Sequence, residues 1–417
     1  MDSWVMPPLP SLPGSSKQLR LYDTAAGSLV PVGPPTPGQV RMYVCGITPY
    51  DAAHLGHAAT YLAFDVAQRV WRDAGHTVRY VQNVTDIDDP LLERANRDNV
   101  DWAALASQET QVFRDDMAAL RIIPPEKYLG VIESMESIAE MVAKLLASGA
   151  AYQLDDGTAD VYFDIKSASD FGYESRLDRA MMLNLFAERG GDAERAGKRD
   201  ALDPLLWRGA REGEPSWPSS MGPGRPGWHV ECSVIAVNEL GMDIDVQGGG
   251  SDLLFPHHEM SAAHAEVAYG THPFAKAYVH TGMIAWQGEK MSKSKGNLVF
   301  TSDLRRAGID PAVIRLALLA GHYRANREWT EDLLAQAQTR LDQWRAAVLA
   351  VAGPDAAPVL AQVRENLADD LDTPGAIAAI DEWAFAVIAD PEPETGSLQA
   401  PALIADTAEA LLGISLR

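Results

Sequence analysis

One stretch of the sequence constrains the fold more than any other, because a strand, a helix and a second strand follow one another in it. Gln39–Cys45 (QVRMYVC) has the pattern of a buried strand, Ala58–Ala74 has helical periodicity, and Thr77–Val84 (TVRYVQNV) has the pattern of the next strand. Strands joined through a helix pair in parallel. We therefore predict an α/β fold with a doubly wound parallel sheet that starts near Gln39.

Two short basic segments predict ATP chemistry on this fold. HLGH stands between the first predicted strand and its helix, where His54 and His57 can donate hydrogen bonds to a phosphate and Gly56 lets a ligand approach the backbone. KMSKS, far along the chain, supplies Lys290 and Lys293, which can neutralise a departing pyrophosphate. Each segment alone is also compatible with a helix cap or a solvated loop. Their order and separation favour a shared triphosphate site.

Two cysteines and one histidine are candidate metal ligands. Cys45, Cys232 and His257 stand in the contexts YVCG, GWHVECS and FPHHEMS, which lack the close spacing of a zinc finger. Two buried thiols and a histidine at a helix start would be an ordinary structural alternative. All three are expected at strand–helix junctions around one cleft. Three protein ligands with an open fourth position would be a working zinc site rather than a structural one.

Composition limits the remaining classes of function. The chain has 417 residues, which predicts two or three domains, and only two cysteines, which excludes a disulfide framework and favours a reducing compartment. A formal net charge of -23 argues against a large nucleic-acid footprint. No apolar stretch reaches transmembrane length, and the prolines near the N-terminus do not fit a signal peptide. We expect a cytoplasmic monomer with no membrane partner.

The order of patterns along the chain predicts an interrupted catalytic domain. Ala159–Ile165 is a candidate strand outside the nucleotide fold, and Glu212–Gly227 holds four prolines, as a linker does. The sheet is expected to resume with Ile244–Gln247 and Ala277–Ala285. The predicted units are an irregular N-terminal segment (1–38), the first half of the catalytic domain (39–125), an inserted connective domain (126–225), the second half with the KMSKS loop (226–300), a stem-contact region (301–345) and a helical bundle (346–417).

These motifs together resemble the cysteinyl-tRNA synthetase branch of the class I aminoacyl-tRNA synthetases. The resemblance covers roughly Arg41 to Trp383 and includes CGITPYDAAHLGHA, NVTDIDD, GRPGWHVECS, GGGSDLLFPHHE, KMSKSKGN and DDLDTPGA. It implies a class I synthetase-like (HUP/Rossmann) fold, ATP with Mg²⁺, and activation of cysteine as its adenylate. It also implies one Zn²⁺ per chain that binds the cysteine thiolate, held by Cys45, Cys232 and His257.

The resemblance also assigns further site residues. His54, His57, Lys290 and Lys293 would be catalytic. The adenylate would contact Cys45, Gly46, Ile47, Thr48, Thr60, Asn83, Val84, Thr85, Trp228, Gly250, Ser251, Asp252 and Ile284. For Asp252 a helix-capping role is an equal alternative, and for Trp228 a place in the core is another.

Departures from the synthetase pattern point to one relative. Ser261 stands where the synthetases carry a fourth zinc ligand, a glutamate, and Pro90 replaces the last residue of NVTDIDDK. Glu188–Ala193 (ERGGDA) is similar to ERGGDP of the cysteine:glucosaminyl-inositol ligases of mycothiol biosynthesis. The chain ends at Arg417, which leaves little room for an anticodon-reading module. We therefore expect ATP, L-cysteine and glucosaminyl-inositol as substrates, and no tRNA. A shortened cysteinyl-tRNA synthetase and a non-catalytic zinc- or nucleotide-binding paralogue are the alternatives.

Overall fold

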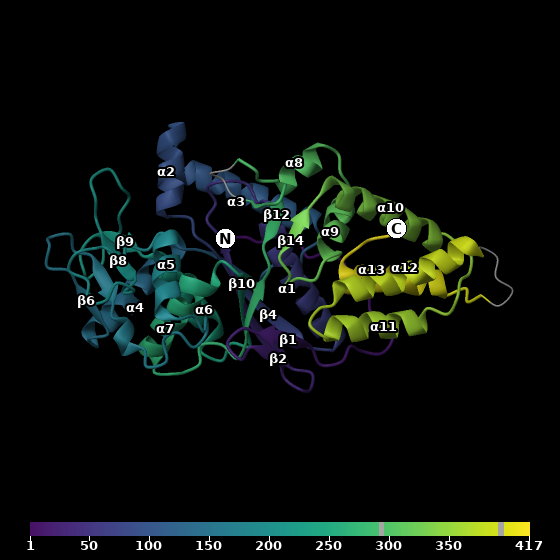
Figure 1. The fold of residues 1–417 in the computed structure, drawn as a ribbon, viewed down its shortest axis with the longest axis horizontal. Coiled ribbons are helices and arrows are strands. Elements are labelled where there is room, and N and C mark those ends of the chain that lie inside the picture. Colours follow the sequence, from purple (N-terminus) through teal and green to yellow (C-terminus); the bar gives the residue numbers. More distant parts are fainter. Residues whose placement is uncertain (292–295, 391–395) are drawn as a thin grey trace.

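A five-stranded parallel sheet forms the centre of the computed structural model, which describes residues 1–291, 296–390 and 396–417 (Figure 1). Across the sheet the strands are β11 (Tyr278–Thr281), β10 (Val246–Gly250), β3 (Gln39–Ile47), β4 (Thr77–Val84) and β5 (Lys127–Gly130). From β3 the chain passes outward through β4 to β5, then returns to β10 and β11 on the other side. The predicted doubly wound fold is confirmed. The winding reverses between β3 and β10, the place where such sheets bind ligands.

Helices connect the parallel strands. Their bounds are α1 (Leu55–Asp73) after β3, α2 (Asp89–Asp98) and α3 (Trp102–Ala119) after β4, and α7 (Glu259–Tyr269) after β10. Helix α1 begins three residues before the predicted Ala58, because the His54 side chain caps it by accepting a hydrogen bond from Gly56 N. It is buried nearly all round, since it packs on the sheet on one side and on the C-terminal helices on the other.

An insertion separates β5 from β10 and lies on the left of Figure 1. Its strands β6, β7, β8 and β9 form a separate antiparallel sheet. Its elements are η1 (Ile132–Ser134), α4 (Met135–Ala147), β6 (Ala151–Gln153), β7 (Val161–Phe163), η2 (Ile165–Ser167), α5 (Arg179–Glu188), β8 (Leu205–Gly209) and β9 (Gly224–Pro226), followed by α6 (Trp228–Leu240). The predicted start at residue 126 is wrong, because Lys127–Gly130 pairs with β4 as the edge strand of the main sheet. This strand is too short for its pattern to be seen in the sequence.

The N-terminal segment is not wholly irregular, which corrects the expectation for residues 1–38. It contains a hairpin of β1 (Arg20–Asp23) and β2 (Ser28–Pro31). The Asp23 carboxylate accepts hydrogen bonds from Ala25 N and Ala26 N in the turn and from Tyr278 N in β11. One side chain therefore both closes the turn and attaches the hairpin to the sheet edge.

The predicted strand Ala277–Ala285 is divided in the structure. Its first part is β11, and its last residues begin β12 (Ile284–Trp286), which pairs with β13 (Glu289–Lys290) and β14 (Arg327–Trp329) in a three-stranded sheet. The chain turns away at Gly282, where a Cβ atom would lie 2.3 Å from the carbonyl oxygen of Ala325. Only glycine permits this approach of two backbones.

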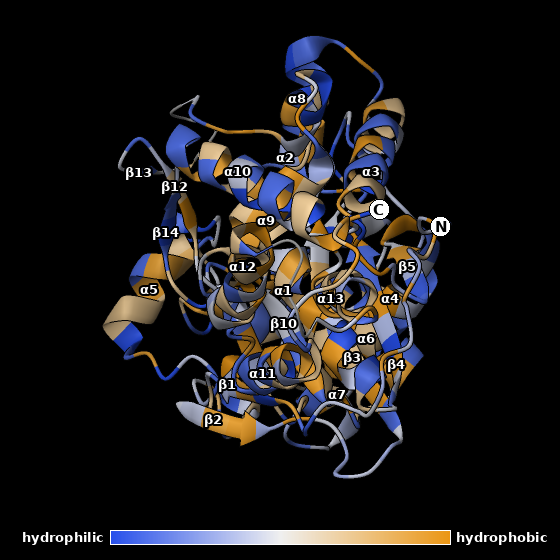
Figure 2. Cartoon of the chain, turned by 90° about the vertical axis from the view of Figure 1, so that its right-hand side faces the viewer, coloured by the Kyte–Doolittle hydropathy of each residue, from blue (hydrophilic) through white to orange (hydrophobic). Residues whose placement is uncertain are grey.

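Helices form the C-terminal part, on the right of Figure 1 and toward the viewer in Figure 2, where single helices carry both orange and blue residues. They are α8 (Thr301–Arg306), α9 (Pro311–Leu319), α10 (Glu331–Val348), α11 (Ala357–Ala368), α12 (Thr373–Ala389) and α13 (Ala400–Leu412). Helix α10 packs on α12, so the bundle begins before the predicted residue 346. None of the described helices has the length and apolar character needed to cross a membrane.

A buried carboxylate connects α1 to this bundle. Asp65 is fully buried and pairs with Arg69 Nε at 2.8 Å and with Arg315 of α9. Arg315 also donates to the carbonyl oxygens of Leu412 (2.5 Å) and Leu120 (2.7 Å), near the ends of α13 and α3. Burial would raise the pKa of Asp65, but the charges of Arg315 and Arg69 hold it below its usual value.

We predict that Arg315→Leu lowers the free energy of unfolding by about 3–5 kcal/mol. The substitution leaves the buried Asp65 carboxylate with Arg69 as its one remaining arginine partner. It also removes the hydrogen-bond donor of two backbone carbonyl groups. Urea denaturation followed by circular dichroism measures the change. Arg345→Leu is the control, since it removes a 2.8 Å ion pair with Asp310 that is partly exposed, where pairs contribute little. Equal losses in the two variants would contradict the role given to Asp65.

Candidate functional site

A cleft of about 390 Å³ opens at the carboxyl ends of β3 and β10, beside the switch point of the sheet. Most residues predicted for the site line it. They are Cys45, Gly46, Ile47, Thr48, His54, His57, Thr60, Asn83, Thr85, Trp228, Cys232, Gly250, Asp252 and His257. The fold therefore brings together segments from both halves of the parallel sheet and from the helix that follows the insertion.

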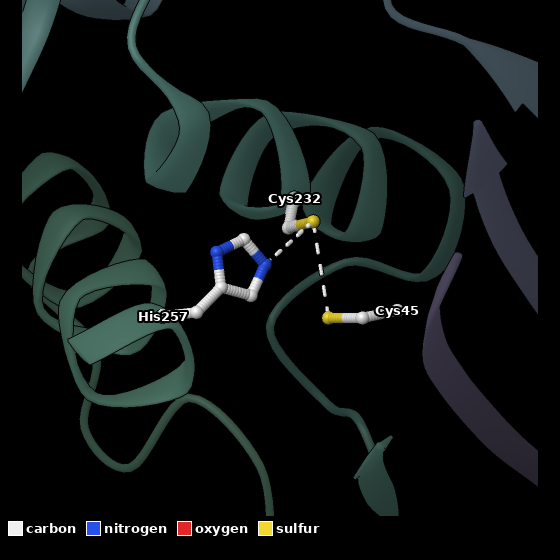
Figure 3. A group of neighbouring side chains, drawn as sticks. All are labelled: Cys45, Cys232 and His257. Atoms are coloured by element: carbon white, nitrogen blue, oxygen red, sulfur yellow. Dashed lines mark hydrogen bonds between the residues drawn. The ribbon is translucent and has the colours of Figure 1, made fainter. Parts of the chain in front are cut away.

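Cys45, Cys232 and His257 converge at one side of this cleft (Figure 3). Cys45 lies in β3, Cys232 in α6, and His257 in the π-helical turn η3 (Leu254–His258). Cys232 is one turn inside α6, not at a strand–helix junction as expected. The two Sγ atoms are 3.8 Å apart, and His257 Nε2 is 3.1 Å from Cys232 Sγ. All three donor atoms lie within 4.8 Å of one another.

The two thiols differ in their readiness to ionise. Burial raises the pKa of the Cys45 thiol well above its usual value, and the neighbouring Cys232 raises it further. Burial acts in the same direction on Cys232, but hydrogen bonding from Cys45 and the nearby His257 bring the pKa of Cys232 well below its usual value. Cys232 is therefore the more easily ionised thiol of the pair, and it accepts the hydrogen bond of the Cys45 thiol.

Neighbours fix the orientation of the His257 ring. Its Nδ1 is 3.1 Å from Nδ1 of His229, and the Trp228 ring stacks on it at 4.4 Å between centroids. The Ser261 hydroxyl lies 2.6 Å from the carbonyl oxygen of His257 and 2.9 Å from that of His229. These contacts leave Nε2 directed at Cys232. A hydrogen bond on the second ring nitrogen is the usual way in which proteins orient a ligating histidine.

The HLGH segment forms the N-terminus of α1 at the cleft. The rings of His54 and His57 stack with centroids 3.8 Å apart. Nδ1 of His54 accepts from Gly56 N at 3.1 Å, so a neutral His54 carries its proton on Nε2 and can donate from there. A Cβ atom on residue 56 would lie 2.8 Å from Cε1 of His54. Gly56 is therefore required by the packing of the histidine ring itself.

A chain of hydrogen bonds runs beside Cys45 and includes two residues of the cleft, Asn83 and Thr85. Oδ1 of Asn83 accepts from Gly46 N at 2.7 Å and from the Tyr43 hydroxyl at 3.0 Å. Nδ2 of Asn83 donates to the Thr85 hydroxyl at 3.2 Å, and Thr85 donates to the buried Glu231 at 3.2 Å. Asn83 thus holds the backbone next to a proposed metal ligand, which gives it a structural role in addition to the predicted one.

The insertion contributes to the cleft through the ERGGDA segment. The Arg189 guanidinium donates to the carbonyl oxygens of Asp252 and Phe255. Asp252 lies in the loop that follows β10, and Phe255 lies in the turn η3 that carries His257. Arg189 therefore supports the segment from which Asp252 and His257 face the cleft. Thr60 adds a contact on the other side through its hydroxyl, 2.8 Å from that of Thr281.

Some of the predicted site residues lie outside the cleft, and some residues that line the cleft were not predicted. Of the predicted residues that the structure describes, Val84, Ser251 and Ile284 do not line the cleft. Lys293 lies outside the described residues, and the backbone of Lys290 ends β13. Lining residues that the sequence reasoning did not assign to the site are Tyr50, Asp51, Ala52, Tyr61, Leu253, Gly282, Met283, Met291 and Leu298. For Tyr50–Ala52 the signal was present, since they stand inside the CGITPYDAAHLGHA motif.

Comparison with known proteins agrees with this geometry. Residues 32–339 match the family of tRNA synthetases class I (C), catalytic domain. The protein is 60% identical to the L-cysteine:1D-myo-inositol 2-amino-2-deoxy-alpha-D-glucopyranoside ligase of Saccharopolyspora erythraea over 418 residues, which span 100% of both chains. It is 61% identical to the ligase of the same name from Salinispora arenicola, again over 418 residues and 100% of both chains.

A solved structure supports the fold. Mycobacterium tuberculosis methionyl-tRNA synthetase in complex with methionyl-adenylate superimposes with a TM-score of 0.61, covering 90% of this chain and 89% of that one. At 17% identity this likeness concerns the fold alone. The two full-length relatives decide between the branches of the family that the sequence left open. The chain belongs to the class I (C) tRNA synthetase catalytic-domain family and, within it, to the L-cysteine:1D-myo-inositol 2-amino-2-deoxy-alpha-D-glucopyranoside ligases, and it is an ATP-dependent ligase.

Proposed function

We propose that this ligase joins the carboxyl group of L-cysteine to the amine of glucosaminyl-inositol in mycothiol biosynthesis, converting ATP to AMP and pyrophosphate. The observation that carries the proposal is the position of the Cys45–Cys232–His257 donor set in the same cleft as the HLGH helix terminus. One end of the cleft is suited to a thiol and the other to a nucleotide. The names of the relatives supply the substrates.

The first half-reaction forms cysteinyl adenylate. The carboxylate oxygen of cysteine attacks the α-phosphorus of ATP, an O–P bond forms, and the bond to pyrophosphate breaks. His54 and His57 stand at the N-terminus of α1, where their N–H groups and the helix dipole stabilise negative charge that grows on the α-phosphate. Lys290 and Lys293 are proposed to neutralise the pyrophosphate, and ATP is expected to bring Mg²⁺ on its phosphates.

The donor set fits a zinc ion. Two sulfur ligands of tetrahedral zinc, each about 2.3 Å from the metal, stand roughly 3.8 Å apart, and the Sγ atoms of Cys45 and Cys232 are 3.8 Å apart. His257 adds a nitrogen donor, and its proximity helps to hold the pKa of Cys232 below its usual value. Zinc held by these residues would accept the thiolate of cysteine in its fourth position and so distinguish it from the hydroxyl of serine.

The second half-reaction forms the amide. The free amine of glucosaminyl-inositol attacks the carbonyl carbon of the adenylate, the C–N bond forms, the bond between that carbon and the phosphate oxygen of AMP breaks, and the nitrogen loses a proton. The proposed role of the cleft is to hold the two reactants together and to exclude water from the activated ester. Trp228, which stacks on His257, and the loop supported by Arg189 would form part of this enclosure.

The proposed reaction predicts two activities with different requirements. Cysteine alone should support exchange of pyrophosphate into ATP, because adenylate formation is reversible. Addition of glucosaminyl-inositol should then give AMP and a cysteinyl amide, which mass spectrometry identifies. Efficient charging of tRNA with cysteine would favour the shortened synthetase, and absence of exchange would favour the non-catalytic paralogue.

Removal of the proposed ligand Cys232 should reduce both the zinc content and the preference for cysteine as substrate. We expect Cys232→Ser to lose bound zinc from this site and to lose the preference for cysteine over serine in pyrophosphate exchange, because a hydroxyl is a poor soft-metal ligand. Inductively coupled plasma mass spectrometry measures the zinc. Val234→Thr, a polar isostere at a buried position of the same helix, is the control and should keep both properties. A Cys232→Ser protein that selects cysteine normally would refute the ligand assignment.

Substitution of the HLGH histidines should change the rate of pyrophosphate exchange and leave the zinc content unchanged. We expect His57→Ala to slow pyrophosphate exchange about 10²–10³-fold, the usual effect of removing one donor to a charged transition state. Zinc content should stay unchanged. His76→Ala is the control, because His76 accepts a hydrogen bond from Gly38 N near the opposite end of α1. If His57→Ala exchanges pyrophosphate at the rate of the control, His57 does not contact the reacting phosphate.

A further inference from the structure

A glutamine in strand β10 is buried without a hydrogen-bond partner. Gln247 has a relative exposure of 0%, and neither its amide nitrogen nor its amide oxygen has a partner among the described residues. Removing a primary amide from water is costly unless another group compensates it. An orphaned buried amide in the centre of a sheet therefore needs a physical explanation.

The strand register places Gln247 on the face of the sheet that carries the proposed zinc ligands. Gln247 pairs with Tyr43 of β3 on one side and with Tyr278 of β11 on the other. Directly paired residues point to the same face of a sheet, and so does Cys45, two residues after Tyr43. The same buried cluster includes Cys232 of α6, which packs on β3. The amide therefore lies below the sulfur atoms of the proposed metal site.

The two tyrosines beside Gln247 use their hydroxyl groups elsewhere. The Tyr43 hydroxyl donates to Oδ1 of Asn83 at 3.0 Å. The Tyr278 hydroxyl is hydrogen-bonded to that of Tyr173 and also accepts from a backbone N–H group. Although both tyrosines are direct neighbours of Gln247 in the sheet, neither of them compensates its amide.

The Cys45 thiol is the group next to which the register places this amide. Burial and the neighbouring Cys232 raise the pKa of the Cys45 thiol, and the Gln247 amide acts on it in the opposite direction. A neutral thiol is a weak acceptor, so this contact leaves the amide without a hydrogen bond of full strength. A sulfur that has lost its proton accepts from an N–H group much more strongly.

We propose that Gln247 is a positioning residue of the zinc site, and that its amide N–H donates to Sγ of Cys45 when this sulfur is bound to zinc. Zinc binds cysteine as the thiolate, which is the acceptor that the amide lacks in the metal-free chain. Hydrogen bonds from surrounding groups orient metal ligands and tune their basicity. The inference rests on the proposed zinc ion at Cys45, Cys232 and His257, and it adds a residue that does not line the cleft.

Substitution of Gln247 should weaken zinc binding without weakening the fold. We expect Gln247→Met to bind zinc about 10–100-fold more weakly than the wild type, the usual effect of removing a group that supports a metal ligand. Competition with a chromogenic chelator measures the affinity of the full-length protein. In the chelator-treated protein the midpoint of thermal unfolding should not fall, because methionine fills a similar space and removes an uncompensated amide.

Gln82→Met is the matched control. Gln82 also has a relative exposure of 0%, but it lies on the other face of the same sheet, and its Oε1 accepts from the Tyr80 hydroxyl at 2.6 Å. Its substitution should lower the unfolding midpoint and leave the zinc affinity unchanged. Gln247→Asn is a second test, because the shorter side chain keeps a polar amide but withdraws its N–H from the sulfur. It should weaken zinc binding as Gln247→Met does, and either variant suffices if the other fails to fold.

The spectrum of bound Co²⁺ separates an effect on the sulfur from a general effect on the fold. Loss of the N–H···S hydrogen bond should shift the sulfur-to-cobalt charge-transfer band of Gln247→Met to longer wavelength, whereas Gln82→Met should keep the wild-type band. Wild-type zinc affinity and an unshifted band in the Gln247 variants would overturn the proposal, and a lower unfolding midpoint beside them would assign Gln247 to packing alone. Absence of bound zinc in the wild type would instead refute the proposed ligand set, and the role of Gln247 with it.

Discussion

The fixed position of α1 depends on the buried carboxylate of Asp65. It pairs with Arg69 and with Arg315, which in turn hold carbonyl groups at the end of α13 and after α3. A buried charge tolerates few arrangements, because each missing partner leaves an uncompensated group in the interior. The same helix carries His54 and His57 at its N-terminus. The C-terminal helices therefore contribute to the cleft indirectly, because they fix the position of the helix whose N-terminus is proposed to face the nucleotide.

The site itself depends on the order of strands in the sheet. Cys45 and Gly250 lie at the carboxyl ends of β3 and β10, which are neighbours although about two hundred residues separate them. The insertion fills much of that interval and leads into α6, which carries Cys232. It also returns to the cleft through Arg189, which holds the backbone of the Asp252 loop. The insertion therefore supports the backbone at one side of the cleft.

The sequence predicted the central strands and their helix well, and it predicted short or distant features poorly. Thr77–Val84 coincides with β4 because eight residues with mostly buried side chains give a clear apolar pattern. Strand β5 has only four residues, and the turn at Gly282 depends on the backbone of Ala325, which no local pattern contains. Similarly, the spacing of Cys45, Cys232 and His257 carried no signal, and they were selected by their expected places around one cleft and by the family resemblance. The Asn83–Thr85–Glu231 chain and the contacts of Arg189 exist only after the fold has formed.

The contacts of Ser261 agree with the proposed set of three protein ligands for zinc. In the resembling synthetases a glutamate at this position supplies a fourth ligand, whereas the Ser261 hydroxyl is engaged with the carbonyl oxygens of His257 and His229. The carboxylate of Glu259, on the same helix, accepts hydrogen bonds from Gly172 N and Ser175 N of the insertion, both at 2.7 Å. It is therefore committed to holding the segment that contains Glu174. Because Ser261 is bound to the backbone and Glu259 to the insertion, neither would compete for a fourth position on the zinc that we propose at Cys45, Cys232 and His257.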